Sequence, residues 1–198
     1  MFAPFLRQLG PAVRAMILLT VVLGIAYPLA LTGFAQAAVP GRADGQLLHR
    51  DGQVVGSRLI GQSFDGDATY FQPRPSAAGD GYDALASSAS NLGPENADLI
   101  KAVADRRAAV AAFEDVDPRD VPPDALLASG SGLDPDISPA YAALQVPRVA
   151  RERGLSESAV RSLVRSATHG RDLGFLGEPH VNVVELNLAL DRAPDAAH

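Results

Sequence analysis

The sequence predicts an α+β protein in which one N-terminal transmembrane helix is followed by a single soluble domain with a small antiparallel sheet and three or four helices. Three observations carry this prediction: a long apolar stretch near the start, an Asp-Gly pair between two apolar runs, and later segments with helical periodicity. The chain has 198 residues. After the anchor this leaves room for one ordinary domain with its own core.

The apolar stretch is long enough to cross a membrane. Residues 15–39 contain no Asp, Glu, Lys, Arg or His and are rich in Leu, Val, Ile and Ala. About 20 such residues span the ~30 Å hydrocarbon layer. Pro28 removes one backbone donor within the segment and therefore predicts a kink. The anchor residues that we single out are Leu18, Val22, Gly24, Pro28 and Gly33.

A cleaved signal peptide is the competing interpretation of the same stretch. Arg7 and Arg14 resemble a charged leader, and Ala35-Gln36-Ala37 resembles a cleavage site. The apolar run exceeds the usual length of about 7–15 residues in a signal peptide, which favours a retained anchor in the cell (inner) membrane. Because long domains translocate largely regardless of charge, we expect residues 1–14 to be a short cytoplasmic tail and residues 40–198 an extracytoplasmic domain.

A β-hairpin is predicted to open the soluble domain. Two apolar runs, residues 46–50 and 53–60, flank Asp51-Gly52, which is the strongest short-range hairpin signal. Residues 61–94 follow neither the strand nor the helix period and are rich in Pro, Gly and Ser. We expect an ordered loop there, because aromatic residues spaced through it can attach it to the core.

Two helices are predicted in the middle of the chain. Asn96 is a good N-cap for a helix that runs to about Phe113. Its Leu and Val residues are expected to form one buried stripe with Ile100, while Arg106 lies on the opposite, solvated face. Residues 138–154 predict a second helix with Ser as cap and Pro at the first position, which Pro147 is expected to split.

The last part of the chain predicts one clear helix and one ambiguous segment. A helix is expected from Ser156 to Thr168, with Gly170 as its stop and with His169 and Arg171 near its last carbonyls. Residues 181–191 alternate like a strand but also carry a capping box, and we choose the helix.

Composition excludes several classes of function. The net charge of −6 gives no basic footprint for sequence-independent binding of nucleic acid. The chain has no cysteine, which excludes thiolate nucleophiles, cysteine metal sites and disulfides. None of the four histidines has an i, i+4 partner, so no metal site is expected.

The most suggestive polar cluster lies in residues 128–139, ASGSGLDPDISP. Ser129 and Ser131 could act as nucleophiles, and Asp134 and Asp136 could bind a hard cation. The segment has neither the glycine-lysine pattern of a phosphate loop nor the spacing of an EF-hand. Turn chemistry, with Ser and Asp side chains bonded to nearby backbone donors, is the favoured interpretation.

A second segment, residues 70–76, combines aromatic residues with an arginine between two prolines. The prolines stiffen the backbone, and arginine beside aromatic side chains is enriched at protein interfaces. This composition favours contact with a partner over catalysis. No stretch of the sequence assembles a nucleophile, a base and an orienting group by spacing alone.

Several motifs, taken together and in this order, resemble the KdpC subunits of bacterial potassium-transporting ATPases. The resemblance spans nearly the whole chain, and the long Ser-Gly-Asp-Pro motif is specific. Residues 86–89 replace a more glycine-rich run, and His180 stands where a basic Arg or Lys is expected. The motifs are GSRLIGQ (56–62), YFQPRPSA (70–77), SNLGP (90–94), ASGSGLDPDISP (128–139), QVPRVA (145–150) and GRDLGFLGEP (170–179).

The resemblance implies a non-catalytic subunit of a high-affinity, ATP-driven potassium uptake complex, with ATP hydrolysis carried by a partner. The implied partners are a channel-like potassium-binding subunit, a P-type ATPase subunit, a small membrane peptide and the lipid bilayer. The family is described as a catalytic chaperone that raises the ATP affinity of the ATPase subunit. ATP is suggested as a ligand only by that description, and no intrinsic cofactor is expected. An extracytoplasmic domain could not reach cytosolic ATP. Assembly and capping of the channel-like subunit is the favoured hypothesis.

The residues carried over as family motif and candidate interface come from all of these segments. They are Gln62, Tyr70, Phe71, Arg74, Pro75, Ser76, Asn91, Gly93, Ser129, Ser131, Gly132, Asp134, Pro135, Gln145, Arg148, Arg171, Phe175 and Glu178. Two alternatives from other classes stay open: an anchored extracytoplasmic hydrolase that uses Ser129 or Ser131, and a single-pass sensor or adhesion module.

Overall fold

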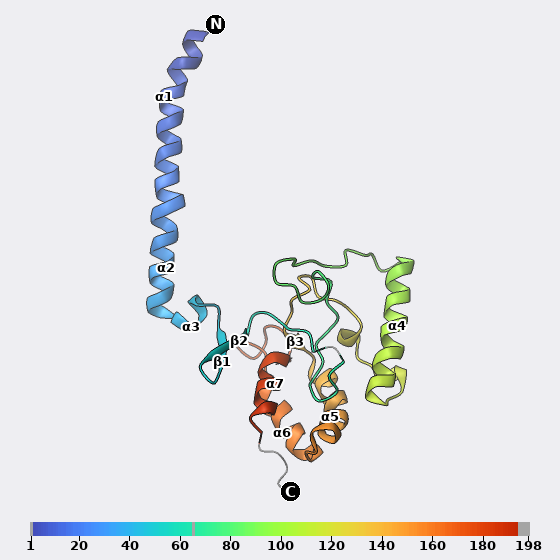
Figure 1. Cartoon of the computed structure of the whole chain (residues 1–198). Helices are drawn as coiled ribbons and strands as arrows, with labels where there is room; N and C mark the ends of the chain where they lie inside the picture. Colours follow the sequence, from blue (N-terminus) through green and yellow to red (C-terminus); the bar gives the residue numbers. More distant parts are fainter. Residues whose placement is uncertain (1, 65, 194–198) are drawn as a thin grey trace. The chain divides into compact units, whose positions relative to one another are not determined.

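The computed structural model describes residues 2–64 and 66–193. The chain forms two compact units, one up to Leu47 and one from Leu48 onwards (Figure 1). The first unit is helical, and the second combines helices with short antiparallel strands. The predicted α+β class is therefore confirmed.

The first unit is a long apolar helix with a short helical turn after it. It consists of α1 (Phe2–Leu19), a π-helix (Thr20–Ala26), α2 (Tyr27–Ala38) and α3 (Pro40–Ala43). By length and composition, Arg7–Ala38 is the one helix of the described chain that could cross a membrane. Its large apolar side chains are exposed, for example Phe34 at 72%, as lipid-facing or partner-facing residues would be.

Just before Pro28, where a kink was predicted, the hydrogen bonding of the helix changes from the α to the π pattern. Proline cannot donate its backbone nitrogen, and its ring clashes with the carbonyl four residues earlier in an ideal α-helix. The π-helix ends at Ala26, two residues before Pro28, which lies in the first turn of α2, and the amide of Tyr27 donates to the carbonyl of Val22. This wider turn accommodates the ring, as π-bulges do inside helices.

The predicted hairpin opens the second unit. Strand β1 (Leu47–Arg50) pairs with β2 (Gln53–Ser57). Asp51 and Gly52 both have positive φ, 51° and 79°, which is the requirement of the tight turn that matches the twist of two strands. The second strand is shorter than predicted and ends at Ser57.

The first two predicted helices form. Helix α4 (Ala97–Glu114) begins at Asn96, whose side chain accepts bonds from two backbone amides of the first turn. The predicted faces of α4 are wrong in part, because Ile100 is 56% exposed and Arg106 donates to the carbonyl of Leu126 at 2.9 Å. Two 3-10 turns follow, η2 (Pro118–Asp120) and η3 (Pro123–Ala125).

Helix α5 (Pro139–Arg153) corrects the prediction that Pro147 splits it. It runs unbroken from its Ser138 cap to Gly154, which has a φ of 65°. Pro147 and Ala143, whose carbonyl loses its partner, are both exposed, so water can satisfy that carbonyl. Burial of the opposite face outweighs the missing bond.

The chain then enters a three-stranded sheet. Helix α6 (Glu157–Ala167) begins at the Ser156 cap and passes straight into β4 (Thr168–His169), so Gly170 is not its stop. Strand β5 (His180–Asn182) is the central strand, between β4 and β3 (Asp136–Ile137), and all pairs are antiparallel. Because the strands are so short, the sequence carried no periodic signal for this sheet.

The segment that was ambiguous divides between a strand and a helix. Strand β5 ends at Asn182, whose side chain accepts a bond from the amide of Glu185 and caps α7 (Val183–Asp191). The chosen helix is confirmed. Helix α5 packs on α6 and α6 on α7 (Figure 1). The core lies among them, with fully buried residues that include Phe71, Val146, Val149, Val160, Val181 and Leu186.

Candidate functional site

Residues 68–70 form a turn and a bend. Residues 71–76, which we call the extended segment, then pair with no strand of the described chain, and side chains bind their backbone instead. Phe71 is fully buried, and the side-chain amide of Asn187 binds both its backbone groups: Oδ1 accepts from the N–H at 2.9 Å and Nδ2 donates to the carbonyl at 3.0 Å. A buried backbone group without a partner costs free energy. Asn187 thus replaces a neighbouring strand at this residue.

Gln145 does the same for the next residue. Its Oε1 accepts from the N–H of Gln72 at 2.6 Å, and its Nε2 donates to the carbonyl of Gln72 at 3.0 Å. Gln145 is fully buried. Two amide side chains, from α5 and α7, therefore hold consecutive residues of the extended segment.

Arg148 completes this arrangement from one turn further along α5. Its Nη1 donates to the carbonyls of Ala68 and Tyr70, and its Nη2 donates to Oε1 of Gln145 at 2.8 Å. Its Nε donates to Oε2 of Glu114 on α4 at 2.9 Å, and both side chains are 1% exposed. Burial raises the pKa of Glu114, against the opposing effect of Arg148.

The segment of residues 128–136 behaves as the turn interpretation predicts. Ser129 Oγ accepts from the amide of Gly132 at 2.9 Å, Ser131 Oγ accepts from Leu133, and Oδ1 of Asp134 accepts from the amide of Asp136. Gly132 has a φ of 68°, and a Cβ there would lie 2.6 Å from the carbonyl oxygen of Ser88.

Residues 74–76 are attached to this turn. Arg74 donates to Asp134 at 2.8 Å and to the carbonyl of Leu127, while Oγ of Ser76 donates to the carbonyl of Gly132 at 2.6 Å. Two motifs that are about 55 residues apart in the sequence therefore form one bonded structure.

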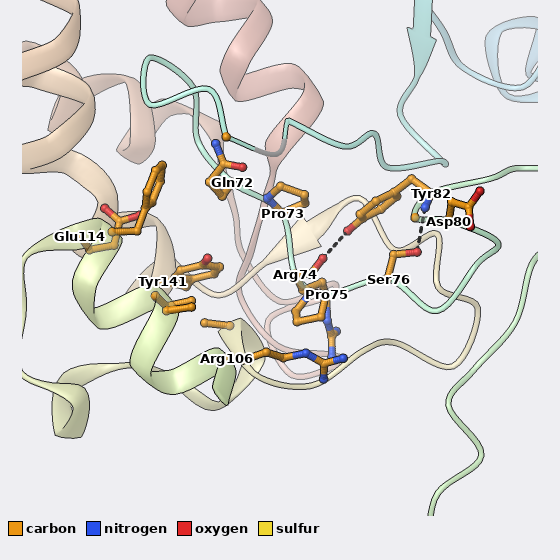
Figure 2. A pocket seen from close by; sticks show the side chains of 16 residues that line it. Gln72, Pro73, Arg74, Pro75, Ser76, Asp80, Tyr82, Arg106, Glu114 and Tyr141 are labelled. Atoms are coloured by element: carbon orange, nitrogen blue, oxygen red, sulfur yellow. Dashed lines mark hydrogen bonds between the residues drawn. The ribbon is translucent and has the colours of Figure 1, made fainter. Parts of the chain in front are cut away.

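A cavity of about 450 Å³ lies between this structure and the helices α4 and α5 (Figure 2). Its walls are largely apolar and include Phe113, Pro73 and Pro75. Its two arginines already have internal partners: Arg74 binds Asp134, and Arg106 donates to the carbonyl of Leu126. The cavity therefore offers a shaped apolar surface and little uncompensated positive charge.

The arrangement gives no support to a serine hydrolase. Nucleophilic serine needs a base within hydrogen-bond reach. In the described residues, the hydroxyl groups of Ser129 and Ser131 accept from backbone amides and bond to each other at 3.5 Å, and neither is hydrogen-bonded to a base. No group of three or more His, Asp or Glu residues in the described chain could hold a metal ion.

The histidines lie elsewhere than predicted. His169 is in β4 and stacks on His180 of β5, with ring centroids 5.3 Å apart, and does not cap α6. Arg171 instead pairs with Glu178 at 2.6 Å. The capping interpretation of His169 and Arg171 is wrong because their side chains have other partners: His169 stacks on His180, and Arg171 pairs with Glu178.

The remaining motif residues divide into internal and exposed groups. Nε2 of Gln62 donates to the carbonyl of Val55 at 2.8 Å, and the hydroxyl of Tyr70 donates to Asp191 at 3.2 Å. Pro135 is buried. The exposed group, whose role at an interface stays a prediction, is Asn91, Gly93, Arg171, Phe175 and Glu178.

Sequence reasoning missed the acidic and amide partners of these motifs. Glu114, Asn187 and Asp191 were not singled out, although each binds a motif residue or a neighbour of one. Asp191 also pairs with Arg50 at 2.7 Å and Arg153 at 2.8 Å. The available signal was a Glu at the end of a helix and an Asn within an apolar helix, where polar residues need partners if they are buried.

Known proteins are similar in sequence to this chain over nearly its whole length. The KdpC family, described as "K+-transporting ATPase, c chain", matches residues 9–192. The "Potassium-transporting ATPase KdpC subunit" of Kineococcus radiotolerans is 61% identical over 188 residues, which cover 95% of each chain. The protein of the same name from Mycobacterium tuberculosis is 55% identical over 188 residues, covering 94% of this chain and 98% of the relative. That from Beijerinckia indica is 52% identical over 186 residues, covering 94% of each. The chain therefore belongs to the KdpC family of K+-transporting ATPase subunits.

Proposed function

We propose that this chain is a non-catalytic subunit that helps to assemble the potassium-transporting complex and to hold its channel-like and ATPase subunits together. One observation carries the proposal: in the described residues, the polar motif side chains of the interior bind the chain's own backbone, and neither Ser129 nor Ser131 is hydrogen-bonded to a base. The long helix offers apolar surface outward. ATP hydrolysis and the ion path are assigned to partner subunits.

The proposed topology has residues 1–14 in the cytoplasm, residues 15–39 in the membrane and the domain of residues 40–198 outside. The exposed apolar helix supports the membrane part. The orientation rests on the rule that long domains translocate largely regardless of charge. On this topology the domain meets the outer face of the channel-like subunit, where it can cap the entrance.

Removing the second unit while keeping residues 1–47 tests the role of the domain. We expect the truncated chain to reach the membrane but to leave fewer partner subunits associated in detergent, and cells to lose growth at low potassium. A complex that assembles and transports normally without the domain would contradict the proposal.

The anchor is proposed to contact a partner helix, and Gly33 allows a sharp test. A Cβ at this glycine meets no atom within 4 Å in the isolated chain, so Gly33→Leu leaves the helix itself intact. If another helix packs there, as small residues permit, the larger side chain should reduce association. Leu31→Phe adds bulk about half a turn away and is the matched control. Equal association of both variants would make the segment a simple tether.

A further inference from the structure

The loop between β4 and β5, residues 170–179, presents three large apolar side chains to solvent. Leu173 is 83% exposed, Phe175 68% and Leu176 50%. Exposed apolar residues are normal when they are scattered singly, whereas adjacent ones mark a contact surface. We call residues 170–179 the β4–β5 loop.

The loop holds these side chains outward through its own backbone bonds. The amide of Asp172 donates to the carbonyl of Leu176 at 2.9 Å, and the reverse bond is also 2.9 Å. Leu173 has a φ of 52°, which is costly for a bulky residue and persists only where surrounding structure fixes it. A fixed loop loses little conformational freedom on binding.

The base of the loop is attached to the core. Strands β4 and β5 pair antiparallel, with His169 opposite His180 and Thr168 opposite the fully buried Val181. Just inside the loop, Arg171 and Glu178 form an ion pair across its two arms. The apolar tip is therefore connected directly to the three-stranded sheet through β4 and β5.

Charge indicates what the tip contacts. Segments that lie on lipid surfaces are typically rich in Lys and Arg, which bind anionic headgroups. This loop has one arginine, Arg171, which is paired with Glu178, and a further acid, Asp172. A tip of apolar side chains with one basic and two acidic residues at its base matches the apolar core and polar rim of a protein interface.

We propose that the β4–β5 loop inserts Phe175 and its neighbours into an apolar pocket of another protein subunit of the same transporter, bordered by charges complementary to Arg171 and Glu178. This inference rests on the proposed function, since it identifies part of the surface through which the chain would join its partners.

Cysteine labelling tests the proposal, because the chain contains no natural cysteine. Phe175→Cys introduces a single thiol, and labelling by a water-soluble maleimide is followed on the 20.6 kDa band. Leu85→Cys is the matched control, because Leu85 is 98% exposed in another loop. Both full-length variants are labelled as purified chains in lipid nanodiscs and as complexes with their partner subunits.

The expected result is that Phe175→Cys labels at least about tenfold more slowly in the complex than in the chain alone, because interface centres exclude water. The Leu85→Cys control should label at the same rate in both. Equal labelling of Phe175→Cys in a complex that assembles would overturn the inference while leaving the subunit role intact. Protection already in the chain alone would indicate bilayer or self contact and would overturn it too. Failure of the unmodified chain to form a complex would instead refute the proposed function, and the inference with it.

A second measurement tests how strongly the loop contributes to binding of the partner subunits. Phe175→Ser should weaken retention of the partner subunits in detergent by about tenfold or more, as truncation of an aromatic anchor does. Leu85→Ser should leave retention unchanged. Unchanged retention for both variants would show that the loop does not bind a subunit.

Discussion

Nε of Arg148 lies 2.9 Å from Oε2 of Glu114, and both side chains are 1% exposed. The guanidinium also stands over the ring of Phe113, 4.6 Å from its centroid. This buried pair joins α4 to α5, and the same arginine donates to the carbonyls of Ala68 and Tyr70. Loss of the Arg148 side chain should therefore destabilise a large part of the second unit at once.

We expect Arg148→Met to lower the free energy of unfolding by about 3–5 kcal/mol, because it leaves a buried carboxylate without its partner. Arg151→Met is the matched control on the same helix, since the Arg151 side chain is 60% exposed and surface pairs contribute little. Urea unfolding of the full-length chain in detergent measures both. A similar, small effect of the two substitutions would contradict the structural role of Arg148.

The pH dependence of stability should reveal the burial of Glu114. Burial raises its pKa above the ordinary value of 4.5, so the folded chain binds this proton more tightly than the unfolded chain. The contribution is fully present below pH 4.5 and is lost as the pH rises through the folded-state pKa. Glu114→Gln cannot titrate. The stability of the unmodified chain relative to this variant should therefore fall as the pH rises above 4.5, and a relative gain instead would mean that the pair with Arg148 lowers the pKa.

Asn187→Leu tests whether a side chain replaces a strand beside Phe71. The substitution keeps the size of the side chain but leaves the N–H and carbonyl of Phe71 buried without partners. We expect a loss of about 1–3 kcal/mol for each group in urea unfolding. The control Gln53→Leu changes an exposed strand residue and should stay within about 0.5 kcal/mol. If Asn187→Leu is as mild as the control, the backbone of Phe71 has another partner.

Local signals in the sequence were sufficient for most helices and for the first hairpin. Asn96, Ser138 and Asn182 cap helices as predicted, because a cap depends on residues within three positions. Ser156, predicted only as the start of a helix, caps one as well. The Asp51-Gly52 turn is equally local. These elements could be predicted because their stabilising bonds are close in sequence.

The bonds that organise the motifs could not be predicted in this way. Phe71 and Asn187 are 116 positions apart, and Glu114 and Arg148 are 34 apart. Helix α5 continues through Pro147 for the same reason, since tertiary burial of its inner face outweighs a local preference. The short strands β3, β4 and β5 exist only because long-range pairing brings them together.

Gly132→Ala should destabilise the second unit, whereas Gly130→Ala should not. A side chain at residue 132 would require a left-handed backbone and would meet the carbonyl oxygen of Ser88 at 2.6 Å, a strain of about 1–3 kcal/mol. At residue 130 a Cβ meets nothing within 4 Å. Thermal unfolding of the two variants measures the difference. Equal melting temperatures would contradict the tight turn.

ATP should not bind to the chain itself. The cavity lined by Arg74 and Arg106 brings two arginines together, but each of them already has an internal acceptor. We expect titration of the full-length chain in detergent with an ATP analogue to show no saturable binding up to millimolar concentration. Saturable binding that Arg106→Ala abolishes would contradict this expectation and assign a nucleotide site to the cavity.

Co-purification tests the central claim most directly. The full-length chain, tagged at its C-terminus, is expressed with the other subunits of the transporter and isolated in mild detergent. The account predicts that the channel-like and ATPase subunits are retained at constant stoichiometry and that the isolated complex hydrolyses ATP in response to potassium. Isolation of the tagged chain alone, beside a fully active complex that lacks it, would contradict the account.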